Sequence, residues 1–148
     1  FWNSISAKTR AIKGKSEEIK AAAENFKVLY PQLQPADIYF TIGSFRSGGT
    51  IKDNMIMIGA EIAAGTPEID LSEFQHNWLA NVFKQQTPEH IVSLCIHEYV
   101  HTMQRGSNGN VLSASIKEGS CDFITEIVLG KKLLVSYLNY GRAHEAEI

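Results

Sequence analysis

The fold of this chain is decided by one short segment, His97-Glu98-Tyr99-Val100-His101, which lies inside a helical pattern. Upstream, Thr87-Pro88-Glu89 is typical of a helix start, because threonine caps, proline fits the first helical position and an acid suits the positive end of a helix. Downstream, Gly106 is typical of a helix stop. We therefore expect a helix from about residue 88 to residue 104.

The two histidines of this segment are four residues apart, so one helix face presents both imidazoles to a common point. Zinc accepts imidazole nitrogens at about 2.0 to 2.1 Å, and a single helix face can supply two of them. Glu98 borders the same face and could take a proton from a zinc-bound water. The pattern predicts a zinc site with His97 and His101 as ligands and Glu98 as general base.

A third ligand is expected from a second helix, which runs from about Ser115 to Leu129 and ends at Gly130. In this helix Glu118 can complete the metal site. Asp122 follows one turn later on the same face and can accept the free ring N–H of a ligating histidine. Gly119 is poor helix material, and it fits a close approach of the two helices.

Other roles remain open for the residues around this site. Ser115 and Glu118 match a capping box, in which Glu118 would only reach back to the Ser115 N–H. Glu126, two turns beyond Glu118, is an alternative ligand. His76 and His90 have no partner at ligand spacing, so both read as ordinary residues.

The rest of the chain predicts an α+β domain in which helices dominate. Further helices are expected at 16–29, at 71–85 and from 132 to at least 139, with a continuation past Gly141 open, and strands at 36–41 and 54–60. The glycine-rich connection at 43–50 reads as a loop joining two antiparallel strands. It lacks the Gly-Lys-Ser/Thr ending of a phosphate-binding loop, which makes a nucleotide site a weak alternative.

Length and composition indicate one ordinary globular domain. The chain has 148 residues, 44% of them hydrophobic, and its net charge of -2 favours neither nucleic acid nor an acidic membrane surface. It holds no apolar run of the roughly 18 residues that a membrane span needs. It begins with Phe1 instead of methionine, so we expect a segment of a longer, soluble protein, consistent with export and removal of a signal peptide.

Two cysteines, Cys95 and Cys121, are too few for a disulfide framework. Both fall in expected helices, and Cys95 should point away from the metal side because it lies two residues before His97. We expect two buried thiols, with a mutual bridge or a metal role as alternatives.

These motifs resemble those of the gluzincins, the thermolysin-like and aminopeptidase-like zinc peptidases, in which H-E-x-x-H is followed by E-x-x-x-D on a later helix. The segments 29–31, 58–61, 96–104 and 117–123 are also similar to a poorly characterised family of predicted bacterial zinc-dependent proteases. The resemblance implies a zincin-like fold with a small antiparallel sheet beside the active-site helix. It implies one Zn²⁺ held by His97, His101 and Glu118. Glu98 would be the general base and Asp122 the partner of His97.

The same resemblance implies peptide or protein substrates and two further parts of the site. Strand 54–60 would be the edge strand that pairs with extended substrate. Tyr140 and His144, four residues apart downstream, would supply a hydrogen-bond donor for the developing oxyanion.

From the sequence we therefore predict a zinc-dependent metallopeptidase that attacks peptide bonds with a metal-activated water. Two hypotheses from other classes remain open: a zinc-binding interaction module without catalysis, and a metal-free helical scaffold with a chance motif. Zinc analysis separates the scaffold from the other two. A Glu98→Gln variant separates the peptidase from the binding module, because only the peptidase loses an activity.

Overall fold

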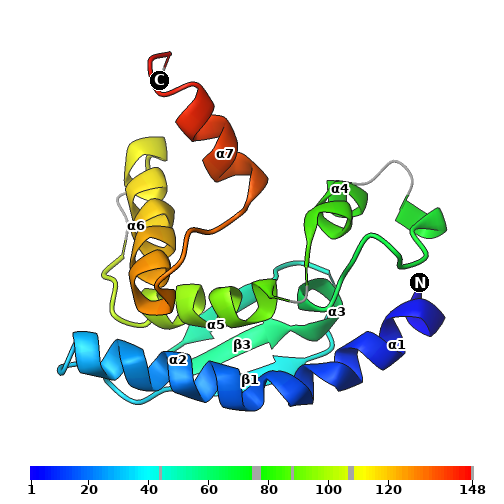
Figure 1. Ribbon diagram of the computed structural model, residues 1–148, viewed down its shortest axis with the longest axis horizontal. Coiled ribbons are helices and arrows are strands. Elements are labelled where there is room, and N and C mark those ends of the chain that lie inside the picture. The colour runs from blue at the N-terminus through cyan, green and yellow to red at the C-terminus, as the bar shows by residue number, and fades with distance from the viewer. Residues whose placement is uncertain (44, 75–77, 88, 107–108, 148) are drawn as a thin grey trace.

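The computed structural model describes residues 1–147 except 44, 75–77, 88 and 107–108. In chain order its elements are α1 (Trp2–Ala11), the 3-10 helix η1 (Ile12–Lys15), α2 (Ser16–Leu29), β1 (Asp37–Thr41), β2 (Gly49–Lys52), β3 (Met55–Gly59), α3 (Ala60–Ala63), the 3-10 helix η2 (Ser72–Phe74), α4 (Trp78–Gln85), α5 (His90–His101), α6 (Val111–Leu129) and α7 (Ser136–Ala143). Helices dominate and the sheet is small, so the α+β class is confirmed (Figure 1).

The sheet has three strands in the order β1-β3-β2 and is mixed, whereas the sequence predicted an antiparallel one. β1 and β3 run parallel, and β2 runs antiparallel to β3. The antiparallel prediction is wrong because the chain forms a further strand, β2, at the end of the glycine-rich segment, and β2 turns back onto β3 through Asp53, a residue with φ of 55°. β3 is therefore the central strand, and its expected role as a substrate-pairing edge strand is wrong too.

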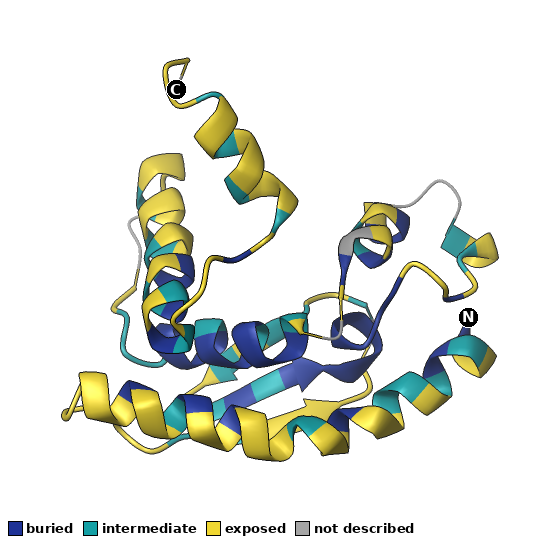
Figure 2. Cartoon of the chain, in the orientation of Figure 1, coloured by how far each residue is buried: buried dark blue, intermediate teal, exposed yellow. Residues whose placement is uncertain are grey.

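One face of the sheet is covered by α5. Ile56 and Ile58 of β3 have no exposed surface, while Met55 and Met57 are half-buried, which is the alternation of a strand with one buried face. In Figure 2 the buried residues concentrate along α5 and β3, and the outer sides of α2 and α6 are exposed. The site helix thus lies at the centre of the core, held from below by the sheet.

α6 stands across the C-terminal part of α5, and α2 runs along α5 on its other side (Figure 1). α6 begins after Asn110, whose side-chain oxygen accepts a hydrogen bond from the Ser113 N–H at 2.8 Å. It ends at Gly130, which adopts the left-handed conformation with φ of 63°. The predicted end is confirmed. The predicted start was Ser115, and the helix begins four residues before it, at Val111.

α2 has the bounds predicted for it, 16–29, whereas the site helix α5 ends at His101 instead of about residue 104, and the remaining helices differ more. α1 was not predicted, and the expected helix at 71–85 is two elements, η2 and α4, separated by residues outside the description, His76 among them. The expected helix at 132–139 begins only at Ser136. The expected start of the site helix at Pro88 also lies outside the described residues. Among the helices that are described, none is long and apolar enough to cross a membrane.

A candidate metal centre

His97, His101 and Glu118 come together where α6 crosses α5. His97 Nε2 lies 3.2 Å from Glu118 Oε2, and His101 Nε2 lies 3.3 Å from the same oxygen. Two atoms bound to one zinc at about 2.0 to 2.1 Å with tetrahedral angles lie about 3.3 to 3.4 Å apart. The separations of Glu118 from the two histidines therefore match those between ligands of one zinc ion.

Asp122 fixes the ring of His97. Its Oδ1 lies 2.9 Å from His97 Nδ1, and its Oδ2 accepts a hydrogen bond from the Tyr137 hydroxyl at 3.0 Å. An ionised carboxylate only accepts hydrogen bonds, so the hydrogen of His97 is on Nδ1. Burial lowers the pKa of His97, but the hydrogen bond and charge of Asp122, together with Glu98 and Glu118, outweigh burial, and the pKa of His97 is raised.

Glu98 is buried beside the two histidines, and this burial raises the pKa of its carboxyl group. The space for its side chain comes from Gly49 of β2, where an added Cβ would lie 2.4 Å from Glu98 Oε1. Gly49 was not predicted as part of the site. A signal was present, since glycine inside a strand often marks a close approach of another group.

The loop that leads into β2 is held by a second buried acid, Glu61 of α3. Its Oε1 accepts hydrogen bonds from the backbone N–H groups of Gly43 at 3.0 Å and Phe45 at 3.3 Å. The Gly59 N–H donates to Gly48 O at 2.9 Å. These contacts fix the segment that carries Gly49 against Glu98.

Cys121 belongs to a second possible ligand set, because its sulfur and one nitrogen each of His97 and His101 all lie within 4.8 Å of one another. Its Sγ is 3.4 Å from His101 Nδ1 and 3.8 Å from Nε2. A metal binds to one ring nitrogen along its lone pair, in the plane of the ring, where an atom is much farther from the other nitrogen. The sulfur lies at similar distances from both nitrogens, so it is not in that direction. Burial raises the pKa of this thiol to about 12. Cys121 packs against the ring, and Glu118 is the better third ligand.

Both cysteines are buried and free, as the sequence predicts for thiols with a packing role. The capping-box interpretation of Glu118 is wrong, because α6 is capped by Asn110 and Ser115 lies inside the helix. Glu126 is bound instead to Lys132 at 2.7 Å and to Arg142 at 2.8 Å, so it is engaged away from the histidines.

Tyr140 and His144 are not brought into the cluster. Their rings stack on each other with centroids 4.0 Å apart, and His144 Nδ1 donates a hydrogen bond to Tyr140 O at 2.8 Å. Within the described ranges, no hydrogen bond or ion pair joins either residue to the histidines of α5 or to Glu118. The tyrosine of α7 that does reach the site is Tyr137, through Asp122.

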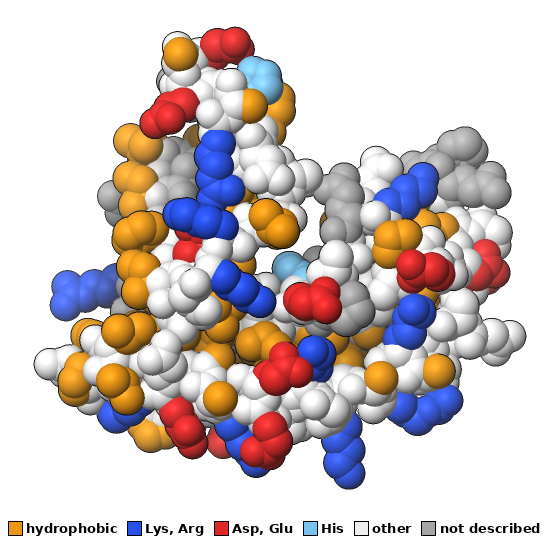
Figure 3. Space-filling view, viewed as in Figure 1, with side chains coloured by type: hydrophobic (Ala, Val, Ile, Leu, Met, Phe, Trp, Pro, Cys, Tyr) orange, Lys and Arg blue, Asp and Glu red, His pale blue; other side chains and the backbone are white. Residues whose placement is uncertain are grey.

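A cavity of about 530 Å³ lies beside the cluster. It is bounded by α4, the start of α5 and the segment 131–137, with His90, Ser93 and Tyr137 in its wall. Figure 3 shows a hollow between α4 on one side and α6 and α7 on the other, with histidine surface at its floor. The Glu118 side chain is 57% exposed, so the centre of the cluster can be reached from solvent.

Comparison with known proteins gives one family. The sequence model described as gliding motility protein GldB matches residues 1–144. No curated protein and no solved structure matches the chain.

This family is not one of zinc peptidases, so the interpretation as a gluzincin, the predicted metallopeptidase activity and the enzyme class are wrong. The physical reason is that H-E-x-x-H and E-x-x-x-D specify an arrangement of metal-binding side chains. That arrangement by itself carries no requirement that a bound water attack a peptide bond.

Proposed function

The chain belongs to the family of the gliding motility protein GldB, and on that premise we propose that it is a metal-binding interaction module. In this proposal His97, His101 and Glu118 hold one Zn²⁺. A side chain of a partner protein in the gliding apparatus fills the remaining coordination position. The metal joins two proteins, and no bond of the partner is broken.

One observation carries the metal proposal: three atoms with lone pairs face one another. Asp122 holds the hydrogen of His97 on Nδ1, so in the neutral ring Nε2 directs a lone pair at Glu118 Oε2, 3.2 Å away. His101 Nε2 faces the same oxygen at 3.3 Å. Such atoms repel one another unless positive charge lies between them. A proton can bridge two of the three atoms, whereas a divalent cation binds all three.

The number of protein ligands leaves room for a ligand from a partner. Structural zinc sites are normally closed by four protein ligands, while three leave one position open. The exposed Glu118 lies at the solvent side of the cluster, where an imidazole or carboxylate from another protein can approach. Within this proposal Glu98 has no catalytic role and fills the space under the site.

The surface of α6 supports a role in protein contact. Its outer face exposes a row of large apolar side chains at helical spacing, which Figure 3 shows as an orange column. The row consists of Leu112, Ile116, Phe123 and Ile127, between 49% and 69% exposed. Contiguous apolar surface of this kind is typical of a protein–protein interface.

Two finer predictions belong to the same proposal. The packing of a histidine-bearing helix on a small sheet supports a zincin-like fold, used here for binding. The family model carries the name GldB_lipo, which supports an exported protein held at a membrane by a lipid anchor. Metabolic labelling of the protein in its host with a lipid analogue tests the anchor, and an unlabelled protein would contradict it.

The experiment that tests the metal proposal is zinc analysis of the purified chain after loading and desalting. We expect one zinc per chain in the wild type and in Glu98→Gln, and none retained in a His97→Ala, His101→Ala double variant. His144→Ala is the matched control, because it removes a histidine outside the cluster. Equal zinc in wild type and double variant would contradict the site.

A second measurement tests the open position. Cobalt(II) replaces zinc and reports its ligands through its visible absorption. Adding imidazole or acetate should change the spectrum if one position is free. A spectrum that does not respond would indicate a closed site, and the partner-docking part of the proposal would fail.

A further inference from the structure

We infer that Gln104 is a positioning residue, which holds His101 in the tautomer that directs its Nε2 lone pair into the metal site, and that α6 in turn fixes Gln104. The metal-binding part of this inference rests on the proposed function. The hydrogen-bond part stands on the structure of the metal-free protein. Gln104 lies three residues after His101, just beyond the end of α5.

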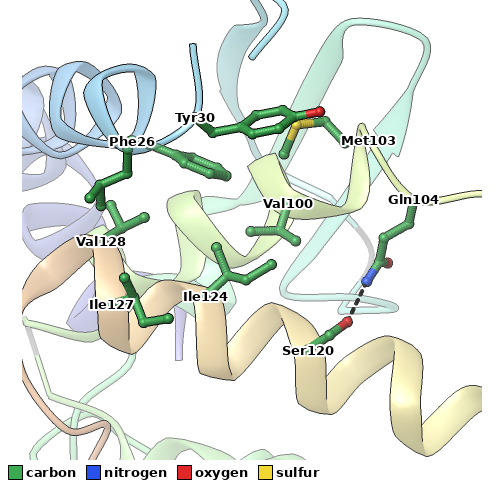
Figure 4. Close-up of a pocket in the computed structure, with 10 residues that line it drawn as sticks. Phe26, Tyr30, Val100, Met103, Gln104, Ser120, Ile124, Ile127 and Val128 are labelled. Carbon is green, nitrogen blue, oxygen red and sulfur yellow. Dashed lines mark hydrogen bonds between the residues drawn. The ribbon is translucent and has the colours of Figure 1, made fainter. Parts of the chain in front are cut away.

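The orientation of the Gln104 amide is set by an acceptor that cannot donate. Gln104 Nε2 lies 2.8 Å from the backbone oxygen of Lys117, and a carbonyl oxygen only accepts. The NH₂ group of Gln104 must therefore point to α6. Its second hydrogen reaches Ser120 Oγ at 2.8 Å, and Ser120 donates its own hydrogen to Lys117 O at 2.9 Å. Figure 4 shows Gln104 reaching from the end of α5 to Ser120 on α6.

With the NH₂ group committed, the other end of the amide faces the histidine. Gln104 Oε1 lies 2.7 Å from His101 Nδ1, and two acceptors at that separation would repel each other. His101 Nδ1 must therefore carry the hydrogen, which leaves a lone pair on Nε2. That atom faces Glu118 Oε2 at 3.3 Å.

The two histidines are thus oriented by different partners, one that belongs to α6 and one that is anchored to it. His97 donates to the carboxylate of Asp122 inside α6, and His101 donates to an amide that is anchored on α6 by Lys117 and Ser120. Because Lys117 immediately precedes Glu118, the same turn of α6 places the carboxylate ligand and sets the second imidazole. Docking of α6 on α5 therefore assembles the whole donor set together.

The test reads the tautomer directly in the metal-free protein. In ¹⁵N-histidine-labelled protein at about pH 8.5, where imidazoles are mostly neutral, we expect His101 to carry its hydrogen on Nδ1. Gln104→Met removes the acceptor at similar length, so the hydrogen should shift toward Nε2 and zinc affinity should fall about 10- to 100-fold. Gln104→Glu keeps an acceptor beside Nδ1 and should keep the tautomer, but it loses the hydrogen bonds to Lys117 O and Ser120 Oγ, so its zinc affinity should lie between those of the wild type and Gln104→Met.

Gln34→Met is the matched control, since Gln34 lies in a loop and its side chain bonds only to Gln32 O at 2.9 Å in the described structure. An Nε2–H tautomer of His101 in the wild type would overturn the inference, and that result needs no variant to fold. Unchanged tautomer and affinity in Gln104→Met would overturn it too. A third outcome is that His101 carries its hydrogen on Nδ1, that only Gln104→Met abolishes this tautomer, and that the protein takes up no zinc. This outcome would support the positioning role and contradict the proposed function.

Discussion

At the scale of single residues, the candidate site depends on which atoms carry hydrogens. The ring nitrogens that face Glu118 have their opposite nitrogens occupied by Asp122 and Gln104. Such partners orient a ligating histidine and raise its basicity. The candidate site is therefore built from pairs, each with one imidazole and one acceptor.

Removing the acceptor of His97 should weaken the site. Asp122→Ala is expected to lower zinc affinity by about 10- to 100-fold, because His97 then loses its fixed tautomer. Asp122→Asn, whose amide oxygen can still accept from Nδ1, should lose less. Competition with a chelating dye measures both affinities, and identical values for Asp122→Ala and wild type would remove Asp122 from the site.

Gly49 should be intolerant of any side chain while Glu98 is present. Gly49→Ala places a Cβ 2.4 Å from the Glu98 carboxylate, and such overpacking costs about 1 to 3 kcal/mol of unfolding free energy. Urea unfolding of Gly49→Ala, Glu98→Ala and the double variant measures the coupling. If the contact between the new Cβ and Glu98 causes the loss, the double variant should lose less unfolding free energy than the sum of the losses of the two single variants. A loss equal to that sum would show that this contact is not the cause.

At the scale of elements, the sequence predicted the site helix and the ligand helix because spacing within a helix is reliable. Residues four apart share a face, so the closeness of His97 to His101, and of Glu118 to Asp122, follows from the pattern alone. How the two helices cross does not follow. Gln104 was missed for that reason, since its meaning depends on a backbone oxygen of α6.

Strand β2 was missed for a local reason. Two of the glycines in the segment 43–50 stand immediately before and at its first position, and glycine is depleted in strands. Tertiary contact overrides that preference, because only a residue without a side chain fits beside Glu98. A close approach to another element cannot be read from a single sequence.

The start of α6 offers a test of how that helix is capped. Asn110→Ala should cost about 1 kcal/mol of unfolding free energy, because the Ser113 N–H loses its acceptor. Ser115→Ala is the control and should be nearly neutral, since Ser115 lies inside the helix. Urea unfolding compares the two variants, and a larger loss for Ser115→Ala would restore the capping-box interpretation.

At the scale of the whole molecule, the site joins two halves of the chain. α5 belongs to the core with the sheet, and α6 docks across it with Glu118 and Asp122 facing the histidines. α5 supplies the two imidazoles and α6 supplies the two carboxylates, and neither helix alone carries the complete set of ligands. A bound metal should therefore stabilise the docked arrangement as well as fill the site.

Zinc should raise the stability of the whole fold. A ligand that binds only the folded chain at a free concentration of 100 times its Kd adds about 2.7 kcal/mol to the free energy of unfolding. Thermal unfolding of the wild type should shift upward with zinc and return on addition of a chelator. The His97→Ala, His101→Ala variant should show no shift, and an equal shift in that variant would assign the effect to zinc bound elsewhere.

The most direct measurement of the central claim is X-ray absorption at the zinc edge of the zinc-loaded chain. We expect four nitrogen or oxygen neighbours at about 2.0 to 2.2 Å, two of them with the outer-shell scattering of imidazole. A sulfur neighbour at about 2.3 Å would place Cys121 in the ligand set instead of Glu118. A chain that retains no zinc after loading would contradict the metal centre altogether.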